Sequence, residues 1–474
     1  MRKAFQIGFG RTERELTIEQ VPLQGTLSKW LNGHLYRNGP GTFVVGEQHY
    51  RHWFDGLAML HKFTFRQGKL SYRNKFLECK AYTQATENNA IVYQEFATDP
   101  NLTGFGKIKS ILSPKITDSS KVNIARLGDK YLALSETPTQ MEFDPEMLNS
   151  LQRFTYDDAA GMHTTTVHPT FDRESHHVYN LVTRFGRISH YRFLSIDKGG
   201  TSSLLCEIPV KNPAYLHSFG LSRRYLIFTE FPFVVQPLAL LFQLRPFIEN
   251  YRWKPKRGTR WFIIDRNTGD IVKRFESSAF FAFHHVNAFE RDNELVVDLV
   301  GYNNPDIINA FYLDTIFNEK ASLPGGQFLR FRIDLTGNRP VHEENLSDEW
   351  IELPRFDEDN LFTQESYRYV YASSVSREHP QSFYNQLVKL DLSSGESKIW
   401  YESHCYPGEP VFVAAPGRAE EDEGVVLSVV LDEKQETSFL LVLDARSFEE
   451  RARAVLPQPI LFGYHGLFVA ENAR

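Results

Sequence analysis

The chain has 474 residues, of which 42% are hydrophobic and 24% are charged, proportions typical of a globular protein. Its 53 basic and 59 acidic residues give a net charge of −6, which excludes a dedicated nucleic-acid-binding protein. The three cysteines, Cys79, Cys206 and Cys405, are far apart and contain no CxxC pair, which excludes a disulfide scaffold and a cysteine metal site.

The cysteine pattern also indicates a reducing compartment. The first residues, MRKAFQ, contain no apolar segment of signal-peptide length, so we expect a cytoplasmic protein. Aromatic residues are abundant, at 14%, with 38 Phe and 21 Tyr. Such a composition suits packing between β-sheets and would also suit an apolar binding tunnel.

Along the chain, residues 1–60 are predicted to form an irregular lead-in, because Gly39-Pro40-Gly41 and Asp55-Gly56 are turn signals. Hairpin patterns then recur, with alternating runs on either side of short polar turns. These turns lie at 67–69, 267–270 and 393–396.

Four apolar runs indicate inner strands: 131–134, 225–228, 295–299 and 439–443. A short helix is predicted at 145–153, and long amphipathic helical patterns are scarce. Many short strands separated by turns indicate an all-β sandwich, barrel or propeller. No Gly/Ser linker or block of charge marks a second domain, so a single domain over 1–474 is predicted.

Residues 231–244, FPFVVQPLALLFQL, carry no charge and are followed by Arg245, Arg252, Lys254, Lys256 and Arg257. The stretch is too short for a bilayer span and is interrupted by two prolines. It is either packed under a loop or exposed as an apolar patch that enters one leaflet, with a basic rim on the headgroups. From the residues alone, burial is the simpler interpretation.

Four histidines in separate segments, His168, His217, His284 and His465, are candidate metal ligands. They are 49, 67 and 181 residues apart, so only a closed, repetitive fold would bring them together. Imidazole is the commonest metal ligand, and an all-imidazole site suits iron, copper or zinc. With 16 histidines in the chain, each one alone is more often a surface or hydrogen-bonded core residue.

The segments around these histidines resemble the carotenoid cleavage oxygenase family, within it the branch of animal β-carotene oxygenases and the retinal pigment epithelium isomerase. The resemblance covers almost the whole chain and rests on several motifs in the same order. They are Leu35–Gly41, Trp53–Gly56, Leu134–Thr137, Phe143–Leu148, Tyr406–Val413 and Gly424–Val430.

The resemblance implies a seven-bladed β-propeller in which long inter-strand loops form a cap over the axial metal site. Seven blades of roughly 40–45 residues would use about 300 residues and leave the remainder for those loops. It also implies a membrane-contacting tunnel mouth at 231–244, with candidate residues Phe231, Phe233, Leu238, Leu240, Leu241 and Phe242.

The resemblance implies that the four histidines bind Fe(II), and the FHxxNA pattern selects His284 over His285. Ligating histidines usually donate their second N–H to a carboxylate, and the family uses three glutamates for this purpose. The matching positions are Glu136, Glu352 and Glu409, with Glu344 and Glu349 as competitors for Glu352.

The expected activity is that of an iron(II)-dependent dioxygenase that cleaves one C=C bond of an apolar polyene with O2 and gives two carbonyl products. Central cleavage of β-carotene to retinal is the specific expectation. The chain is shorter than the animal members, which leaves eccentric cleavage or an apocarotenoid substrate open. No organic cofactor is expected, because no GxGxxG after a strand and no P-loop is present.

Three alternatives stay open at this stage. Isomerisation without oxygenation occurs in the same branch. Cleavage of a stilbene would need polar partners for a phenol, for which Lys107, Lys109 and Tyr93 are candidates, although ordinary surface positions fit them better. A carotenoid-binding propeller without turnover would not need the four histidines. The sequence does not indicate an oligomeric state.

Overall fold

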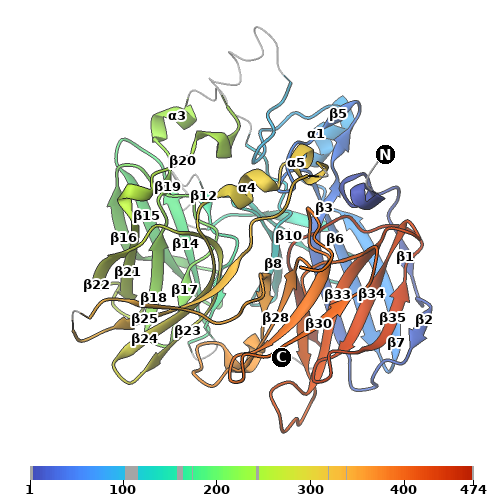
Figure 1. Ribbon diagram of the computed structural model, residues 1–474. Coiled ribbons are helices and arrows are strands. Elements are labelled where there is room, and N and C mark those ends of the chain that lie inside the picture. Colours follow the sequence, from blue (N-terminus) through green and yellow to red (C-terminus); the bar gives the residue numbers. More distant parts are fainter. Residues whose placement is uncertain are drawn as a thin grey trace.

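The computed structural model describes residues 4–101, 116–156, 164–172, 175–241, 245–318, 320–337 and 339–471. Over these residues the chain folds as a seven-bladed β-propeller, which confirms the predicted fold class (Figure 1). Each blade is an antiparallel sheet of four to six strands, and two short ribbons, β4–β5 (Val44–Val45, Gln48–His49) and β19–β20 (Phe233–Val234, Arg252–Trp253), lie outside the blades.

The blades are numbered here in chain order, and the strands of each are given from the axis outward. Blade one contains β36 (Gly466–Ala470), β3 (Gly33–Thr42), β6 (Leu57–Arg66), β7 (Lys69–Phe76) and β1 (Thr17–Ile18). Blade two contains β8 (Asn123–Leu127), β9 (Lys130–Leu134), β10 (Gln140–Phe143) and β11 (Ser150–Phe154). Blade three contains β12 (Thr164–Thr165) and β13 (Thr170–Phe171), then β14 (Val178–Arg184), β15 (Ser189–Ile196) and β16 (Ser202–Val210).

Blade four contains β17 (Gly220–Leu221), β18 (Tyr225–Glu230), β21 (Thr259–Asp265) and β22 (Ile271–Ser277). Blade five contains β23 (Phe281–Arg291), β24 (Glu294–Tyr302), β25 (Gln327–Asp334) and β26 (His342–Asn345). Blade six contains β27 (Glu352–Arg355), β28 (Tyr369–Ser374), β29 (Gln386–Asp391) and β30 (Ser397–Tyr401). Blade seven contains β31 (Cys405–Pro407) and β32 (Val411–Ala414), then β33 (Gly424–Asp432), β34 (Thr437–Asp444), β35 (Glu450–Val455) and β2 (Leu23–Gly25).

Both ends of the chain close the ring. The C-terminal strand β36 pairs with β3 in blade one, and the N-terminal strand β2 pairs with β35 in blade seven. Aromatic contacts join neighbouring blades, as between Trp261 on β21 and Phe331 on β25, whose ring centroids are 5.0 Å apart. Such pairs stabilise the packing beyond the area that they bury.

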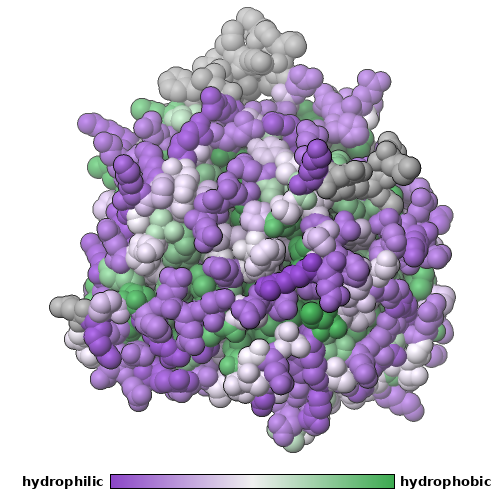
Figure 2. All heavy atoms as spheres, in the orientation of Figure 1, coloured by the Kyte–Doolittle hydropathy of each residue, from purple (hydrophilic) through white to green (hydrophobic). Residues whose placement is uncertain are grey.

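The helices are short and lie in the loops: η1 (Ala4–Phe9), α1 (Lys80–Asn88), α3 (Pro237–Leu241), η2 (Phe247–Asn250), η3 (Pro255–Arg257), α4 (Asp306–Ala310), α5 (Leu313–Ile316) and α6 (Glu358–Leu361). Helices α1, α3, α4 and α5 gather at one end of the propeller, at the top of Figure 1. None of the helices in the described ranges is long and apolar enough to cross a membrane. The face of the molecule in Figure 2 is largely hydrophilic, with apolar residues scattered among polar ones.

The three predicted hairpins are confirmed as β6–β7, β21–β22 and β29–β30, and the four apolar runs lie in β9, β18, β24 and β34. The predicted helix at 145–153 is wrong, because Ser150–Phe154 forms β11 and pairs with β10. In this case pairing along an existing sheet overrides the local helical pattern.

The irregular lead-in predicted for residues 1–60 is also wrong in part, because Gly33–Thr42 is the long strand β3. Pro40 fits within this strand because the ladder with β36 covers only Gly33–Arg37, so Pro40, which has no N–H, is not required to donate to it. A register shift between Pro40 and Thr42 marks a bulge on the side that faces β6.

Candidate metal centre

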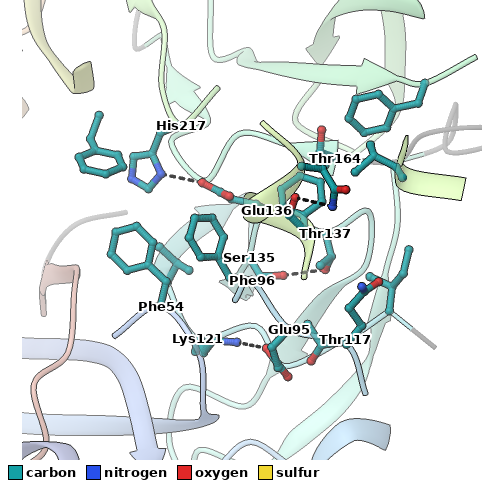
Figure 3. Close-up of a pocket in the computed structure, with 18 of the residues that line it drawn as sticks. Phe54, Glu95, Phe96, Thr117, Lys121, Ser135, Glu136, Thr137, Thr164 and His217 are labelled. Carbon is teal, nitrogen blue, oxygen red and sulfur yellow. Dashed lines mark hydrogen bonds and ion pairs between the residues drawn. The ribbon is translucent and has the colours of Figure 1, made fainter. Parts of the chain in front are cut away.

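A cavity of about 830 Å³ runs from the propeller axis into the loops at the end that carries α3 (Figure 3). His217, His284 and His465 contribute to its wall near the axis, and Leu238 and Leu240 of α3 contribute to its wall further out. Aromatic side chains make up much of the surface between these ends: Trp53, Phe54, Phe96, Phe185, Phe247, Phe283, Phe311 and Tyr464. The cavity is therefore suited to an elongated apolar ligand.

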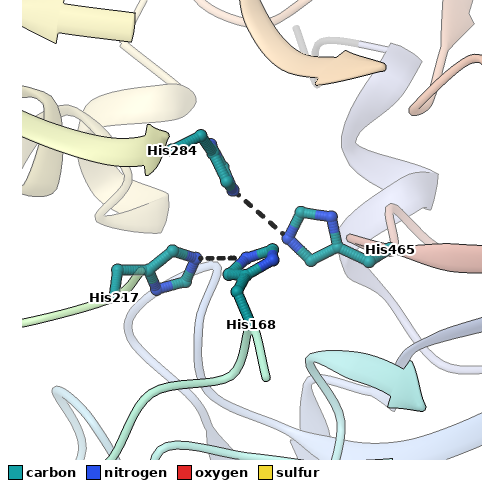
Figure 4. Close-up of side chains that lie close together, drawn as sticks. All are labelled: His168, His217, His284 and His465. Carbon is teal, nitrogen blue, oxygen red and sulfur yellow. Dashed lines mark hydrogen bonds between the residues drawn. The ribbon is translucent and has the colours of Figure 1, made fainter. Parts of the chain in front are cut away.

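The four candidate histidines meet at the axis, and their side chains point toward one another (Figure 4). Each belongs to the part of its blade nearest the axis. His168 lies between β12 and β13, His217 precedes β17, His284 lies in β23, and His465 directly precedes β36. A ring of blades thus brings together four residues whose successive separations in the sequence are 49, 67 and 181 positions.

The spacing of the imidazoles suits one shared metal ion. Nε2 of His168 lies 3.3 Å from Nε2 of His217, and Nε2 of His284 lies 3.4 Å from Nε2 of His465. Two nitrogens bound to one metal at about 2.1 Å are separated by about 3.0 Å at adjacent octahedral positions and by about 3.4 Å at tetrahedral ones. All four ligand atoms lie within 4.8 Å of one another.

Three of the histidines contact the three predicted glutamates. Nδ1 of His217 lies 2.7 Å from Oε1 of Glu136, and Nδ1 of His465 lies 2.8 Å from Oε1 of Glu409. Nδ1 of His284 contacts Oε1 of Glu352, and the competitors Glu344 and Glu349 do not take part in this contact. A carboxylate can only accept a hydrogen bond, so each Nδ1 donates and each Nε2 keeps its lone pair for the centre.

His168 is held differently. Among the described residues its Nδ1 has only the amide of Asn123 as a partner, at the long distance of 3.5 Å from Nδ2. The same Nδ2 donates to the Val167 carbonyl, and Oδ1 of Asn123 accepts from the Ile124 N–H. The backbone therefore fixes the orientation of the amide, and no carboxylate in the described part of the chain sets the tautomer of His168.

Each glutamate is in turn held by other side chains, which the sequence analysis did not identify. The Tyr215 hydroxyl donates to Glu136 at 2.6 Å, and the Tyr302 hydroxyl donates to Glu352. Arg37 donates to Oε2 of Glu409 at 2.7 Å, and Nη1 of Arg355 lies 3.3 Å from the same oxygen. Of these four residues, only Arg37 could have been noticed in the sequence, because it lies within the Leu35–Gly41 motif.

The environment sets the charge of these groups. Burial lowers the pKa of His168 and of His217, and it lowers the pKa of His465 to about 4. Burial alone would raise the pKa of Glu409, but Arg355, His465 and Arg37 outweigh it and lower the pKa to about 2. At neutral pH these three imidazoles are therefore neutral and the Glu409 carboxylate is charged, which suits the binding of a cation.

His285 faces away from the centre, as the FHxxNA pattern predicts. Its Nδ1 lies 2.9 Å from the Ser218 hydroxyl, and its Nε2 lies 3.0 Å from the Thr229 hydroxyl. Both ring nitrogens are thus occupied within blade four, and His284 alone of the pair reaches the axis.

The predicted tunnel-mouth segment is divided between core and surface. Phe231 and Phe233 are only 2% and 8% exposed and pack in the main hydrophobic core, whereas Leu238 is 66% exposed. Leu240 lines the cavity. The side chain of Leu241 and all of Phe242 lie outside the described residues, as do Lys107 and Lys109, while Tyr93 packs against the main core.

A seven-bladed propeller with four histidines on its axis is the arrangement expected for a carotenoid cleavage oxygenase. Comparison with known proteins supports this class. The profile of the family described as retinal pigment epithelial membrane protein matches residues 9–470, and the chain belongs to this family.

Similar proteins include β,β-carotene 15,15′-dioxygenase of Gallus gallus, 33% identical, with 96% of both chains covered. Carotenoid isomerooxygenase of Galleria mellonella is 32% identical over 98% of this chain and 96% of that one. Among solved structures, cobalt-substituted apocarotenoid oxygenase (ACO) of Synechocystis is 26% identical, with a TM-score of 0.86 and 99% and 98% of the two chains covered.

Proposed function

We propose that this protein is an iron(II)-dependent dioxygenase that cleaves one C=C bond of a carotenoid into two carbonyl products. Central cleavage of β-carotene to retinal is the specific reaction we propose. The observation that carries the proposal is the position of His217, His284 and His465 at the axial end of a cavity with aromatic walls. The names of its relatives, β,β-carotene dioxygenase and apocarotenoid oxygenase, support the same reaction.

The four histidines would hold the iron, with Glu136, Glu352 and Glu409 orienting three of them. When bound, iron(II) in an all-imidazole site keeps its full charge and supplies open positions for the activation of O2. The chain contributes the rest of the site. The Nδ1 contacts with the glutamates fix three ring orientations, and the three carboxylates would compensate the charge of the cation from outside its ligand shell.

The cavity would select the double bond by position. A conjugated polyene offers many chemically similar bonds, so only the depth to which it enters the cavity distinguishes them. Phe54, Phe283 and Phe311 lie near the histidines and offer apolar surface to the chain of the substrate. The same surface excludes water from the polyene beside the centre.

We propose further that α3 contacts a membrane from which an apolar substrate enters. Leu238 projects into solvent beside the cavity, and Arg187, Lys211 and Arg245 line the same cavity. An exposed leucine with basic neighbours suits the interface between lipid tails and anionic headgroups. We also propose that residues 1–474 form one domain, with the loops that carry the short helices as a cap over the site.

A product assay tests the main proposal. Purified protein loaded with Fe(II) is incubated in air, in detergent micelles, with β-carotene, an apocarotenal or resveratrol, and product masses are compared with an iron-free control. Iron-dependent retinal from β-carotene is the expected result, and the His284→Ala variant should form none. Formation of a different apocarotenoid aldehyde would support carotenoid cleavage but at another double bond. Product formed only from resveratrol would overturn the proposal. The absence of product from all three substrates, with iron verified in the protein, would also overturn it.

A further inference from the structure

A second cavity, of about 1020 Å³, is lined by the innermost strands of the propeller. Every residue of β8, from Asn123 to Leu127, lines it, and so does every residue of β36, from Gly466 to Ala470. Both strands begin beside the histidines, because Asn123 contacts His168 and Gly466 directly follows His465. We call this space the axial cavity. It extends away from the histidines for about 13 Å, the length of a short strand.

The metal centre lies between the axial cavity and the cavity with aromatic walls. His284 and His465 line both, and within the described ranges they are the only lining residues that the two cavities share. His217 lines the aromatic cavity but not the axial one, and His168 lines the axial cavity but not the aromatic one. The centre can therefore be approached from two sides.

The wall of the axial cavity carries charged side chains in ion pairs. Nη1 of Arg266 lies 3.1 Å from Oδ2 of Asp172, and Nε of Arg355 donates to Oε1 of Glu358 at 2.5 Å. Polar walls of this kind offer hydrogen bonds to a hydrated cation, whereas a passage between aromatic rings would force the cation to give up water at a high cost. The axial cavity is therefore the side better suited to a divalent metal ion.

His168 is the ligand that the protein holds least firmly. The other three histidines each donate from Nδ1 to a glutamate, whereas Nδ1 of His168 has only the amide of Asn123, at 3.5 Å, as a partner in the described part of the chain. His168 is also half-buried, while the other three are buried. Rotation of its ring would break the fewest hydrogen bonds. The ligand that moves most easily thus lies on the side of the axial cavity.

We infer that the axial cavity is the passage through which metal ions enter and leave the centre, and that His168 moves aside to admit them. This inference rests on the metal centre of the proposed function and goes beyond the proposed reaction. It assigns separate entrances to metal and substrate, so an apolar substrate in the aromatic cavity would not obstruct metal exchange.

The rate of metal loading tests the inference. Metal-free protein is mixed with Co(II), and the visible absorption of the bound ion gives the loading rate; transfer of the ion to EDTA gives the release rate. Ala414 is half-buried at the end of β32 and lines the axial cavity. Ala414→Trp should slow loading and release by the same factor, about tenfold or more, because the protein must first open around the new ring. The Kd should not change, since a narrowed passage alters rates and leaves the bound and free states as they are.

The matched control narrows the other cavity. Leu240 is also half-buried, and it lines the aromatic cavity from α3. The Leu240→Trp variant should load and release Co(II) at the wild-type rates. Slower loading in Leu240→Trp than in Ala414→Trp would place the metal route in the aromatic cavity and overturn the inference.

A change of charge provides a second test that leaves the packing of the blades alone. Asp359 is an exposed residue of α6 that lines the axial cavity. Asp359→Lys should slow Co(II) loading by about threefold or more at low ionic strength, and salt should reduce the effect. Glu87→Lys is the control, since it makes the same change of charge on α1, at the end of the propeller that carries α3 (Figure 1). It should leave the loading rate unchanged.

Unchanged rates in both Ala414→Trp and Asp359→Lys would overturn the inference. So would faster release from Ala414→Trp without slower loading, because that result indicates damage to the ligands. If Ala414→Trp does not fold, the comparison of Asp359→Lys with Glu87→Lys decides. Wild-type protein that binds no Co(II) and no Fe(II) would refute the metal centre and with it the proposed function.

Discussion

The three carboxylates behind the histidines differ in what holds them. Glu136 and Glu352 each accept from a tyrosine hydroxyl, whereas Glu409 faces the guanidinium groups of Arg37 and Arg355. A neutral tyrosine can lose its partner at the expense of one hydrogen bond, but a buried arginine would be left with an uncompensated charge. Glu409 therefore has two roles: it orients His465, and it stabilises the fold by neutralising buried positive charge.

This difference predicts distinct effects of Glu136→Gln and Glu409→Gln. Both changes should weaken iron(II) binding by about 10–100-fold, because each removes the anion that orients a ligating histidine. Only Glu409→Gln should also destabilise the metal-free protein, by about 3–5 kcal/mol, because it leaves the buried Arg37 facing an uncharged amide, whereas Arg355 keeps its ion pair with Glu358. Iron titration and urea unfolding in the presence of a chelator separate the two effects. Equal loss of metal-free stability in both variants would contradict this assignment.

The metal centre illustrates which residues a single sequence can reveal. The four histidines and Glu136 and Glu409 sit in short recognisable motifs, so a resemblance could identify them one by one. Tyr215 and Tyr302 contact glutamates that are 79 and 50 positions away, and nothing in their local sequence indicates a partner. Such contacts follow from the arrangement of blades, which local patterns do not encode.

At the scale of elements, local signals succeeded where turn chemistry and alternation coincide. The polar turns at 67–69, 267–270 and 393–396 each join two paired strands of one blade. Local sequence signals gave wrong predictions where pairing with distant strands decides the structure. Strand β3 tolerates Pro40 because its ladder with the C-terminal strand ends at Arg37, and β11 replaces a helical pattern because β10 offers a partner.

Helix α3 is the element that the membrane proposal depends on. Replacement of Leu238 by Glu should reduce binding to liposomes that contain anionic lipid, because a charge at this position opposes insertion into the bilayer. Val272→Glu is the matched control, since Val272 is also exposed, at 51%, but lies on β22, the outer strand of blade four. Co-sedimentation of both variants with liposomes is the measurement. Equal binding of Leu238→Glu and wild type would place the membrane contact elsewhere or exclude it.

For the whole molecule, every blade contributes one residue to the candidate metal centre on the axis. His465, Glu136, His168, His217, His284, Glu352 and Glu409 come from blades one to seven in that order. The ring is closed by β36 and β2, so both chain ends take part in closing the propeller around these residues. A metal ion at the axis would therefore add a link between blades that are joined elsewhere only through their neighbours.

This arrangement predicts that iron(II) stabilises the folded state as a whole. The unfolded chain cannot bring together four ligands spread over three hundred residues, so binding to the native state alone should raise the free energy of unfolding by about 2.7 kcal/mol at a hundredfold excess over Kd. For a chain of this length that corresponds to a rise in Tm of about 3 °C. Thermal unfolding under anaerobic conditions, with iron(II) or with a chelator, measures the difference. The His284→Ala variant should show a smaller shift, and a wild-type Tm unchanged by iron(II) would contradict a four-histidine site in the native protein.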